Sequence, residues 1–378
     1  MMHRREFLAS GAGALASALA YKADAAPAST KGEWRNRQPS MAYRRLGRTG
    51  FMISEMVMGG NRIAPDNHEH VLLAMDMGLN YLDTAAAYGG GNSERGYAHV
   101  IRARKRDTFF LNSKVSLWDI NRNRLYQEIF AGLPESEQTK LRARAQEEID
   151  RRQALEPDYF GDYFQGQRKE LEESALSNVL SRQYGHKIDR GKNYRQLILD
   201  SVDQSLQRLG TDHLDLLMCP HGACTPYEVL NHPEIFEAFE TLRKQGKVRH
   251  LGLSAHNDPG GILEAAVDAK VYSAAMVAYS IVNHRWVDRA LEKAARNDVG
   301  VIAMKVARPV FNGRNNATPD DSRRVKMIQD AVPGPLKVPQ KAYVWALRNP
   351  RLGGVISELV NAELVRDNLP LAGVKQKG

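Results

Sequence analysis

The chain has 378 residues, of which 43% are hydrophobic and 26% are charged, and its formal net charge is +9. This is an ordinary globular composition, and the length exceeds the roughly 250 residues of a single barrel domain. Basic and acidic residues are mixed along the chain, and no basic stripe with interleaved aromatic residues stands out. We therefore expect no nucleic-acid partner.

The N-terminal residues carry three features in the order typical of an export signal. Arg4-Arg5 precede a weakly apolar run over residues 7–20, and Ala23-Asp24-Ala25 follows as a small-x-small cleavage pattern. Residues 1–25 therefore resemble a twin-arginine signal, with a disordered basic tail as the alternative. The resemblance implies recognition by the twin-arginine export machinery and a periplasmic location. We expect residues 26–40, rich in Ala, Ser, Pro and Lys, to be a linker.

Residues 41–378 alternate short apolar runs with amphipathic helical patterns. The predicted strands are Met56–Met58, Tyr81–Asp83, Phe109–Lys114, Leu214–Cys219, Val248–Ser254, Ala274–Tyr279, Val299–Lys305 and Gly354–Ser357. Helices are predicted at His68–Met77, Tyr194–Leu209, Pro233–Gln245 and Pro339–Arg348. Eight strands that alternate with helices predict parallel pairing through right-handed crossovers. We expect an α/β fold, a closed (β/α)₈ TIM barrel, with an open doubly wound sheet as the alternative.

Two segments add to the barrel pattern. Residues 42–51 are typical of a β-hairpin that turns at Gly47–Gly50, and it would close the bottom of the barrel. Residues 117–193 form a long insertion after the third strand, where a loop usually has only a few residues. Within it, helices are predicted near 134–154 and 167–184, with the aromatic turn Tyr159–Phe164 between them. We expect a lid or an interface element, and the alternative is a surface excursion without function. No stretch of the chain is long and apolar enough for a stable membrane span.

Four polar side chains follow three consecutive predicted strands. Asp83 and Tyr88 follow the second strand, Lys114 ends the third, and His221 follows the fourth. Because catalytic groups of parallel barrels lie at the C-terminal ends of the strands, these four side chains should share one face. Each residue alone is weak evidence, since a single Asp, Lys or His at a strand end is common.

These residue types suit the interconversion of a carbonyl and an alcohol. Addition of a hydride to a carbonyl leaves an alkoxide that needs a proton, and Tyr88 would supply it as general acid. We expect the Lys114 ammonium to lower the pKa of Tyr88 and the Asp83 carboxylate to keep Lys114 charged. His221 would orient the carbonyl oxygen or assist proton transfer.

The two cysteines, Cys219 and Cys224, flank His221, and the sequence leaves three interpretations open. An oxidising compartment would permit a disulfide over this short separation. A metal site with His221 lacks a visible fourth ligand, so we expect no metal. The third interpretation is two free thiols.

With these four residues and the segments around them, the sequence resembles the aldo-keto reductase family. The resemblance runs from Tyr43 to about Leu369 outside the insertion and rests on the segments Tyr43–Gly50, Asn80–Ala85 with Tyr88-Gly89, Asn92–Glu94, Leu206–Leu216, Gly246–Ser254 and Trp345–Pro350. It implies the (β/α)₈ barrel, a nicotinamide dinucleotide of the NADP(H) type, and the set Asp83, Tyr88, Lys114 and His221 as catalytic residues.

The resemblance also assigns cofactor-binding positions. They are Gly59, Gly60, Ser254, Met276, Tyr279, Met304, Lys305 and Asn368. Ser254 corresponds to a serine that contacts the nicotinamide carboxamide, whereas Met276 and Met304 replace a glutamine and a tyrosine. Glu358, Leu359 and Leu364 stand where many members bind the 2′-phosphate with cationic and hydroxyl side chains. Since recognition of that phosphate normally needs a cation, NAD(H) is the alternative cofactor.

The function we expect is an oxidoreductase that transfers a hydride between a nicotinamide cofactor and an aldehyde, ketone, sugar or alcohol. One alternative is a barrel that binds a nucleotide or another ligand without redox turnover, because fold alone does not guarantee chemistry. Another is a metal-assisted lyase or isomerase that uses His221 and Asp83. That alternative lacks the His-x-His or Glu-x-x-His spacing that commonly holds a metal.

Overall fold

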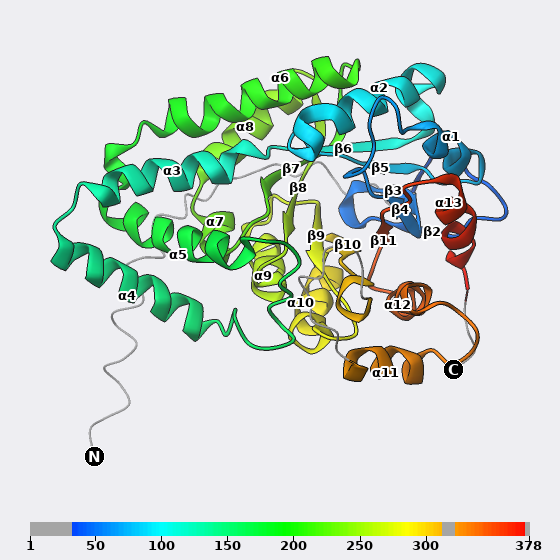
Figure 1. Cartoon of the computed structure of the whole chain (residues 1–378). Helices are drawn as coiled ribbons and strands as arrows, with labels where there is room; N and C mark the ends of the chain where they lie inside the picture. The colour runs from blue at the N-terminus through cyan, green and yellow to red at the C-terminus, as the bar shows by residue number, and fades with distance from the viewer. Residues whose placement is uncertain (1–31, 312–321, 375–378) are drawn as a thin grey trace.

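A computed structural model describes residues 32–311 and 322–374. The predicted export signal, residues 1–25, lies outside the described residues. Within them, eight parallel strands form a closed barrel in the order β10-β11-β4-β5-β6-β7-β8-β9, and helices surround it (Figure 1). The barrel strands are β4 (Met56–Met58), β5 (Tyr81–Asp83), β6 (Phe110–Lys114), β7 (Leu214–His221), β8 (Val248–Ala255), β9 (Ala274–Ala278), β10 (Gly300–Met304) and β11 (Gly354–Ser357).

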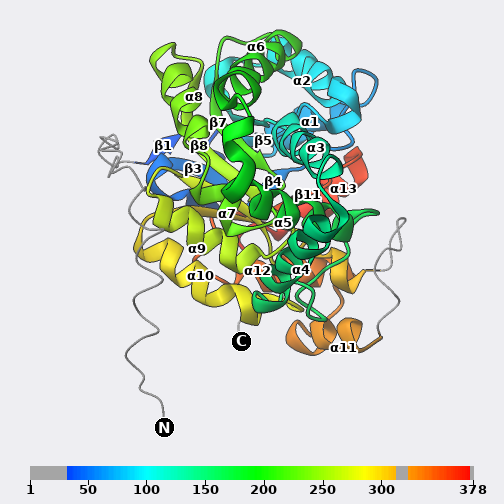
Figure 2. The same cartoon turned by 90° about the vertical axis from the view of Figure 1, so that its left-hand side faces the viewer.

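The predicted strands agree with the barrel strands to within two residues at every end, and the predicted closed barrel is confirmed. The helices outside the insertion are α1 (Glu69–Asp76), α2 (Asn92–Ala103), α6 (Leu197–Leu209), α7 (Pro226–Leu230), α8 (Pro233–Lys244), α9 (Pro259–Ala269), α10 (His284–Arg296), α11 (Ser322–Ala331), α12 (Val338–Leu347) and α13 (Ala362–Asn368). Figure 2 shows α9, α10 and α12 along one side of the barrel and α2, α6 and α8 along the opposite side.

The predicted hairpin closes the bottom of the barrel. Strands β2 (Tyr43–Arg45) and β3 (Phe51–Ser54) are antiparallel, and Leu46, Phe51 and Ile53 are buried in the cluster that fills the barrel interior. The rings of Phe51 and Phe110 stack with centroids 4.3 Å apart. The interior is therefore a packed core, and a reactant can approach only from the opposite end of the barrel.

The segment 26–40 differs from the expected linker in its described part. Strand β1 (Glu33–Trp34) pairs in parallel with β3. Arg35 lies 3.2 Å from the carboxylate of Asp215, a fully buried residue on β7 that Arg106 and Arg249 also contact. A buried carboxylate needs such partners. The Ala, Ser and Pro content of residues 26–40 did not indicate that this segment contributes Arg35 as a partner of Asp215.

The insertion after β6 is confirmed and contains three long helices, α3 (Leu117–Ala131), α4 (Glu135–Arg151) and α5 (Gln167–Tyr184). The sequence predicted α4 and α5 but not α3. The buried side chains of α3 are a mixture of aromatic, charged and amide groups, including Trp118, Asp119 and Arg122, so α3 has no apolar stripe at helical spacing. Figure 1 shows the three helices extending from one end of the barrel.

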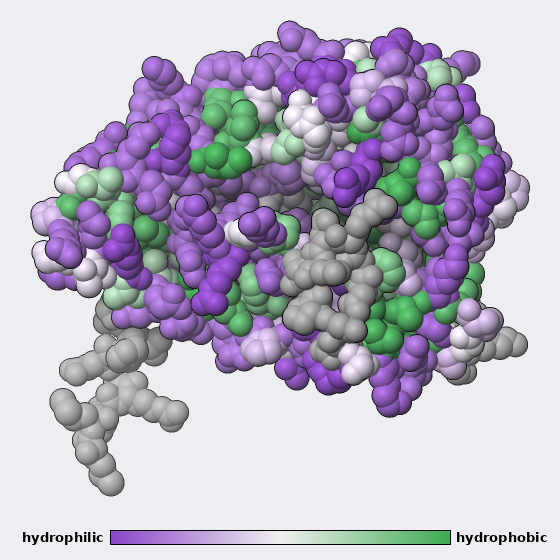
Figure 3. All heavy atoms as spheres, viewed as in Figure 1, coloured by the Kyte–Doolittle hydropathy of each residue, from purple (hydrophilic) through white to green (hydrophobic). Residues whose placement is uncertain are grey.

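None of the helices within residues 32–311 and 322–374 combines the length and the apolar character needed to cross a membrane. The face shown in Figure 3 is largely hydrophilic, and its hydrophobic residues form separate patches.

Candidate active site

The four candidate catalytic residues lie at the C-terminal ends of neighbouring barrel strands. Asp83 is the last residue of β5, Lys114 the last of β6 and His221 the last of β7. Tyr88 begins a short 3-10 helix, η2 (Tyr88–Gly91), five residues after Asp83. The apolar strands are buried side by side in the barrel. Because neighbouring strands are parallel and paired in register, their polar C-terminal residues lie on one face of the barrel.

Asp83 and Lys114 form a fully buried ion pair. The Lys114 Nζ atom lies 2.5 Å from Asp83 Oδ1 and donates a second hydrogen bond of 2.8 Å to the backbone oxygen of Thr84. Asn112 Nδ2 donates to the same Asp83 oxygen at 2.9 Å. Burial lowers the pKa of Lys114, while the Asp83 carboxylate opposes that shift. The carboxylate therefore holds the ammonium charged in a place where it would otherwise tend to lose its proton.

Tyr88 contacts both Lys114 and His221. The Lys114 Nζ atom lies over the Tyr88 ring, 4.7 Å from its centroid, and the Tyr88 and His221 rings meet edge to face with centroids 6.0 Å apart. The structure thus brings together all four residues that the sequence singled out.

The prediction that Lys114 lowers the pKa of Tyr88 is wrong. Burial, followed by the negative charge of Asp83, raises the pKa of Tyr88 well above its ordinary value. Lys114 does not reverse the shift, because its charge is paired with Asp83 and lies over the face of the ring. Tyr88 is therefore a phenol that keeps its proton until a strong base such as an alkoxide forms beside it.

His221 is neutral at ordinary pH. Burial, together with the positive charge of Lys114, lowers the pKa of His221 to about 3. The Nδ1 atom lies 2.8 Å from Ser116 Oγ, and the same oxygen accepts a hydrogen bond from the backbone N–H of Ala87 at 3.2 Å. The Ser116 hydroxyl can donate to Nδ1 or accept from it, and in either case the contact orients the imidazole ring. The sequence did not single out Ser116, which directly precedes α3.

Three of the predicted cofactor positions lie at adjacent strand ends. Ser254 on β8 pairs with Met276 on β9, and β9 pairs with β10, which ends at Met304. Met276 and Met304 belong to the interior core cluster. The Ser254 hydroxyl is buried and accepts from the backbone N–H of Gly222 at 3.3 Å. These side chains therefore border the same end of the barrel as the four candidate catalytic residues.

Gly59 and Gly60 allow close packing at the end of β4. A Cβ atom on Gly60 would lie 2.0 Å from the backbone oxygen of Asp83, and one on Gly59 would lie 2.9 Å from the oxygen of Ser357. Any side chain at position 60 would displace Asp83. Both glycines therefore support the site by leaving room for the neighbouring strands.

Three further cofactor candidates are spread more widely. The Tyr279 hydroxyl donates to Asp288 at 2.9 Å and accepts from Asn349 at 3.0 Å, and its ring stacks on that of Trp345. The structure thus holds Tyr279 among the outer helices and does not bring it to the interior cluster. Lys305 follows β10, and burial lowers its pKa while the nearby Glu358 opposes the shift.

The last cofactor candidate, Asn368, is buried at the end of α13. Its neighbour Asp367 pairs with Lys337 at 2.7 Å. Residue 368 therefore lies on a helix outside the barrel rather than at a strand end.

Cys219 and Cys224 are both buried free thiols, so of the three interpretations the structure shows the third. Burial raises the pKa of both thiols well above its ordinary value, which makes them poor nucleophiles and poor metal ligands. Within the part of the chain that the structure describes, no three His, Cys, Asp or Glu side chains are grouped so that they could bind a metal ion.

Comparisons with known proteins agree with this fold. Residues 55–375 match the model of the aldo/keto reductase family. The uncharacterized oxidoreductase YqkF of Bacillus subtilis is 22% identical over 353 residues, which cover 89% of this chain and 92% of that protein.

Two solved structures are similar in fold. The aldo-keto reductase AKR11C1 from Bacillus halodurans, in its holo form, superimposes with a TM-score of 0.58 at 19% identity and covers 89% of this chain and 93% of its own. The thermostable aldo-keto reductase Tm1743, in complex with the inhibitor epalrestat, gives a TM-score of 0.56 at 21% identity and covers 89% and 96%.

The family match, together with the closed parallel barrel, places the chain among the barrel oxidoreductases. The chain belongs to the aldo/keto reductase family. It is accordingly an oxidoreductase that acts on carbonyl compounds.

Proposed function

We propose that Tyr88 donates the proton and that Asp83, Lys114 and His221 prepare it for this role. The observation that carries the proposal is the convergence of the buried Asp83–Lys114 pair and the His221 ring on the two sides of Tyr88. A nicotinamide dinucleotide, when bound, supplies the hydride in the reductive direction and accepts it in the oxidative one.

The protein's own side chains carry out the remaining steps of the reaction. In this proposal the neutral His221 imidazole carries its proton on Nε2, donates a hydrogen bond from it to the carbonyl oxygen and holds that oxygen near Tyr88. As negative charge develops on that oxygen, the Tyr88 hydroxyl transfers its proton. Lys114 Nζ lies 4.7 Å from the centroid of the Tyr88 ring, and its positive charge offsets part of the negative charge that then forms on Tyr88. The buried Asp83 carboxylate keeps Lys114 charged throughout.

The residues at the barrel mouth fit the nicotinamide end of such a cofactor. Ser254 offers a buried hydroxyl beside the apolar surface of Met276 and Met304. The resemblance suggests NADP(H), but the exposed carboxylate of Glu358 follows β11 where a 2′-phosphate would need a cation. A carboxylate suits the ribose hydroxyl of NAD(H) better. We therefore propose a nicotinamide dinucleotide as cofactor and favour NAD(H) over NADP(H).

The Tyr88→Phe variant tests the proton donor. It removes only the hydroxyl, so we expect kcat for the reduction of an aldehyde to fall by about 10²- to 10⁴-fold while the dinucleotide still binds. Stopped-flow fluorescence would measure binding, and the loss of dinucleotide absorbance would measure turnover. Tyr97→Phe is the matched control, because the Tyr97 hydroxyl is buried without a hydrogen-bond partner in the described residues. Full activity in Tyr88→Phe would contradict the assignment.

The Glu358→Gln variant tests cofactor selection. Wild-type protein should bind NADH more tightly than NADPH. Removal of the exposed negative charge should raise the affinity for NADPH by roughly 2- to 5-fold at low salt, with little change for NADH. Fluorescence titration with both dinucleotides measures the ratio, and Glu363→Gln, which neutralises another exposed carboxylate, is the control. Tighter binding of NADPH than of NADH by the wild type would contradict the preference.

We also propose that residues 1–25 direct export through the twin-arginine pathway into the periplasm, on the support of the Arg4-Arg5 motif and the pattern that follows it. Replacement of both arginines by lysine should leave the protein in the cytoplasmic fraction, whereas Lys22→Gln should not. Cell fractionation followed by immunoblotting measures the distribution. Equal periplasmic amounts of the double variant and the wild type would refute this route.

A further inference from the structure

Three consecutive residues of the loop that follows β8 fasten the insertion to the barrel. The His256 ring meets the Phe164 ring edge to face, with centroids 5.3 Å apart. Asn257 Oδ1 accepts a hydrogen bond of 3.0 Å from Gln167 Nε2. Asp258 accepts a hydrogen bond of 2.7 Å from the Tyr159 hydroxyl. The insertion therefore reaches the loop that begins directly after Ala255, at the end of the barrel where the candidate catalytic residues lie.

The aromatic turn Tyr159–Phe164 is also held from its other side. Asp158 pairs with Arg323 at 2.8 Å and with Arg324 at 2.7 Å, both from α11. The Tyr159 ring stacks on Trp286 of α10 with centroids 5.3 Å apart. Because the turn is anchored to α10, to α11 and to the loop after β8, it has the contacts of a fixed wall rather than of a free loop.

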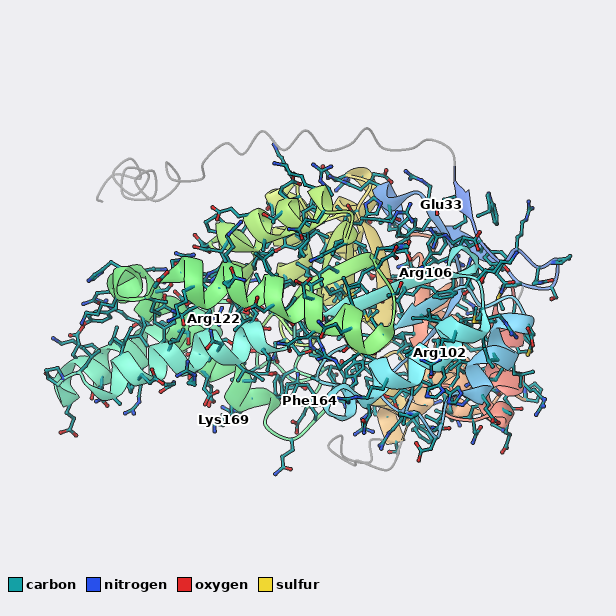
Figure 4. The ribbon with its side chains drawn as sticks, turned by 90° about the horizontal axis from the view of Figure 1, so that it is seen from above. Glu33, Arg102, Arg106, Arg122, Phe164 and Lys169 are labelled. Atoms are coloured by element: carbon teal, nitrogen blue, oxygen red, sulfur yellow. The ribbon has the colours of Figure 1, made fainter. Side chains whose placement is uncertain are left out.

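Packing within the turn also indicates that the turn is fixed. A Cβ atom on Gly161 would lie 2.0 Å from Cζ of Tyr163, so this position needs glycine for the chain to fold back on the Tyr163 ring. Tyr163 is buried, whereas Phe164 is only half-buried. Figure 4 shows Phe164 where the insertion meets the barrel, while Arg122 and Lys169 lie farther out along the insertion.

His256 links this turn to the candidate catalytic residues. It is half-buried two residues after Ser254, and its Nδ1 atom is buried without a hydrogen-bond partner in the described residues. Burial, and then the positive charges of Lys305 and Lys114, lower its pKa well below the ordinary value. These charged neighbours show that His256 borders the same polar cluster, and at ordinary pH its ring is neutral.

Exposed apolar side chains also lie at the start of α3, close to the site. Leu117 and Ile120, in the first turn of α3, are 54% and 62% exposed, directly after Ser116, which contacts His221. Exposed large aliphatic side chains close to a site are typical of surfaces that bind apolar groups. The site therefore has aromatic and neutral groups at the loop after β8 and exposed aliphatic groups at the start of α3.

We propose that Phe164 and His256 form a wall of the substrate site and select carbonyl compounds with a flat aromatic face over short aliphatic ones. The proposal rests on the proposed function, because it assigns the substrate class of the same site. An aromatic substrate would pack against the Phe164 ring, and its carbonyl would point toward Tyr88 and His221. The insertion then determines substrate specificity through the fixed side chain of Phe164.

The test compares benzaldehyde with propanal in wild-type protein, in Phe164→Ala and in Phe160→Ala. Phe160 lies on the same turn but makes no ring contact with His256 in the described residues, so it serves as the matched control. Loss of the aromatic contact should raise the KM for benzaldehyde by about tenfold in Phe164→Ala, with kcat little changed. The KM for propanal should stay nearly constant, and Phe160→Ala should resemble the wild type with both substrates. An equal rise for both substrates, or the same effect in Phe160→Ala, would overturn the proposal.

Binding of benzyl alcohol, followed by NMR titration, separates this proposal from the proposed function. If the wild type reduces neither aldehyde, the proposed function fails. The affinity for benzyl alcohol then tests by itself whether Phe164 contacts the aromatic ring. About tenfold weaker binding in Phe164→Ala than in Phe160→Ala supports it. Equal affinities in the two variants overturn it.

Discussion

The buried ion pair between Asp83 and Lys114 is the interaction on which the chemistry of this site depends. An isolated ammonium in the barrel interior would lose its proton, and an isolated carboxylate would gain one. At 2.5 Å the carboxylate opposes the loss of the Lys114 proton, and Asn112 and Thr84 supply further hydrogen bonds to the pair. The pair is nearly neutral as a whole, so it can lie under Tyr88 without removing the phenolic proton.

The rest of the barrel positions this pair. Asp83 and Lys114 end adjacent strands, so the register of β5 and β6 sets their separation. Gly60 leaves the space in which the Asp83 backbone lies. At the other end, the hairpin residues Leu46 and Phe51 fill the barrel, which leaves the end with Tyr88 as the route for substrate. The insertion then restricts that end through its contacts with the loop after β8.

Much of the fold and the candidate site could be predicted from the sequence, because both rest on local patterns. Apolar runs bounded by turn residues gave the strands, and the residues at their ends gave Asp83, Tyr88, Lys114 and His221. Properties that depend on several distant groups could not be predicted. The pKa of Tyr88 reflects how the charge of Lys114 is shared with Asp83. Helix α3 buries charged and amide side chains beside aromatic ones and exposes Leu117 and Ile120, so its apolar residues do not mark the buried face.

The resemblance assigned Tyr279 to the cofactor site, but its hydroxyl is bound by Asp288 of α10 and by Asn349, which follows α12. Arg35 and His256 owe their roles to partners far away in the chain and follow no motif.

A titration of Tyr88 tests the central claim most directly. Tyrosine labelled with ¹³C at Cζ reports ionisation of each ring by NMR, and the Tyr88→Phe variant assigns the signal. Because the charge of Lys114 is paired with Asp83, the account predicts that Tyr88 is still protonated at about pH 10, where an ordinary tyrosine is half ionised. In Asp83→Asn its pKa should fall, since the negative charge that raises it is gone. A wild-type Tyr88 that ionises below about pH 10 would contradict the account.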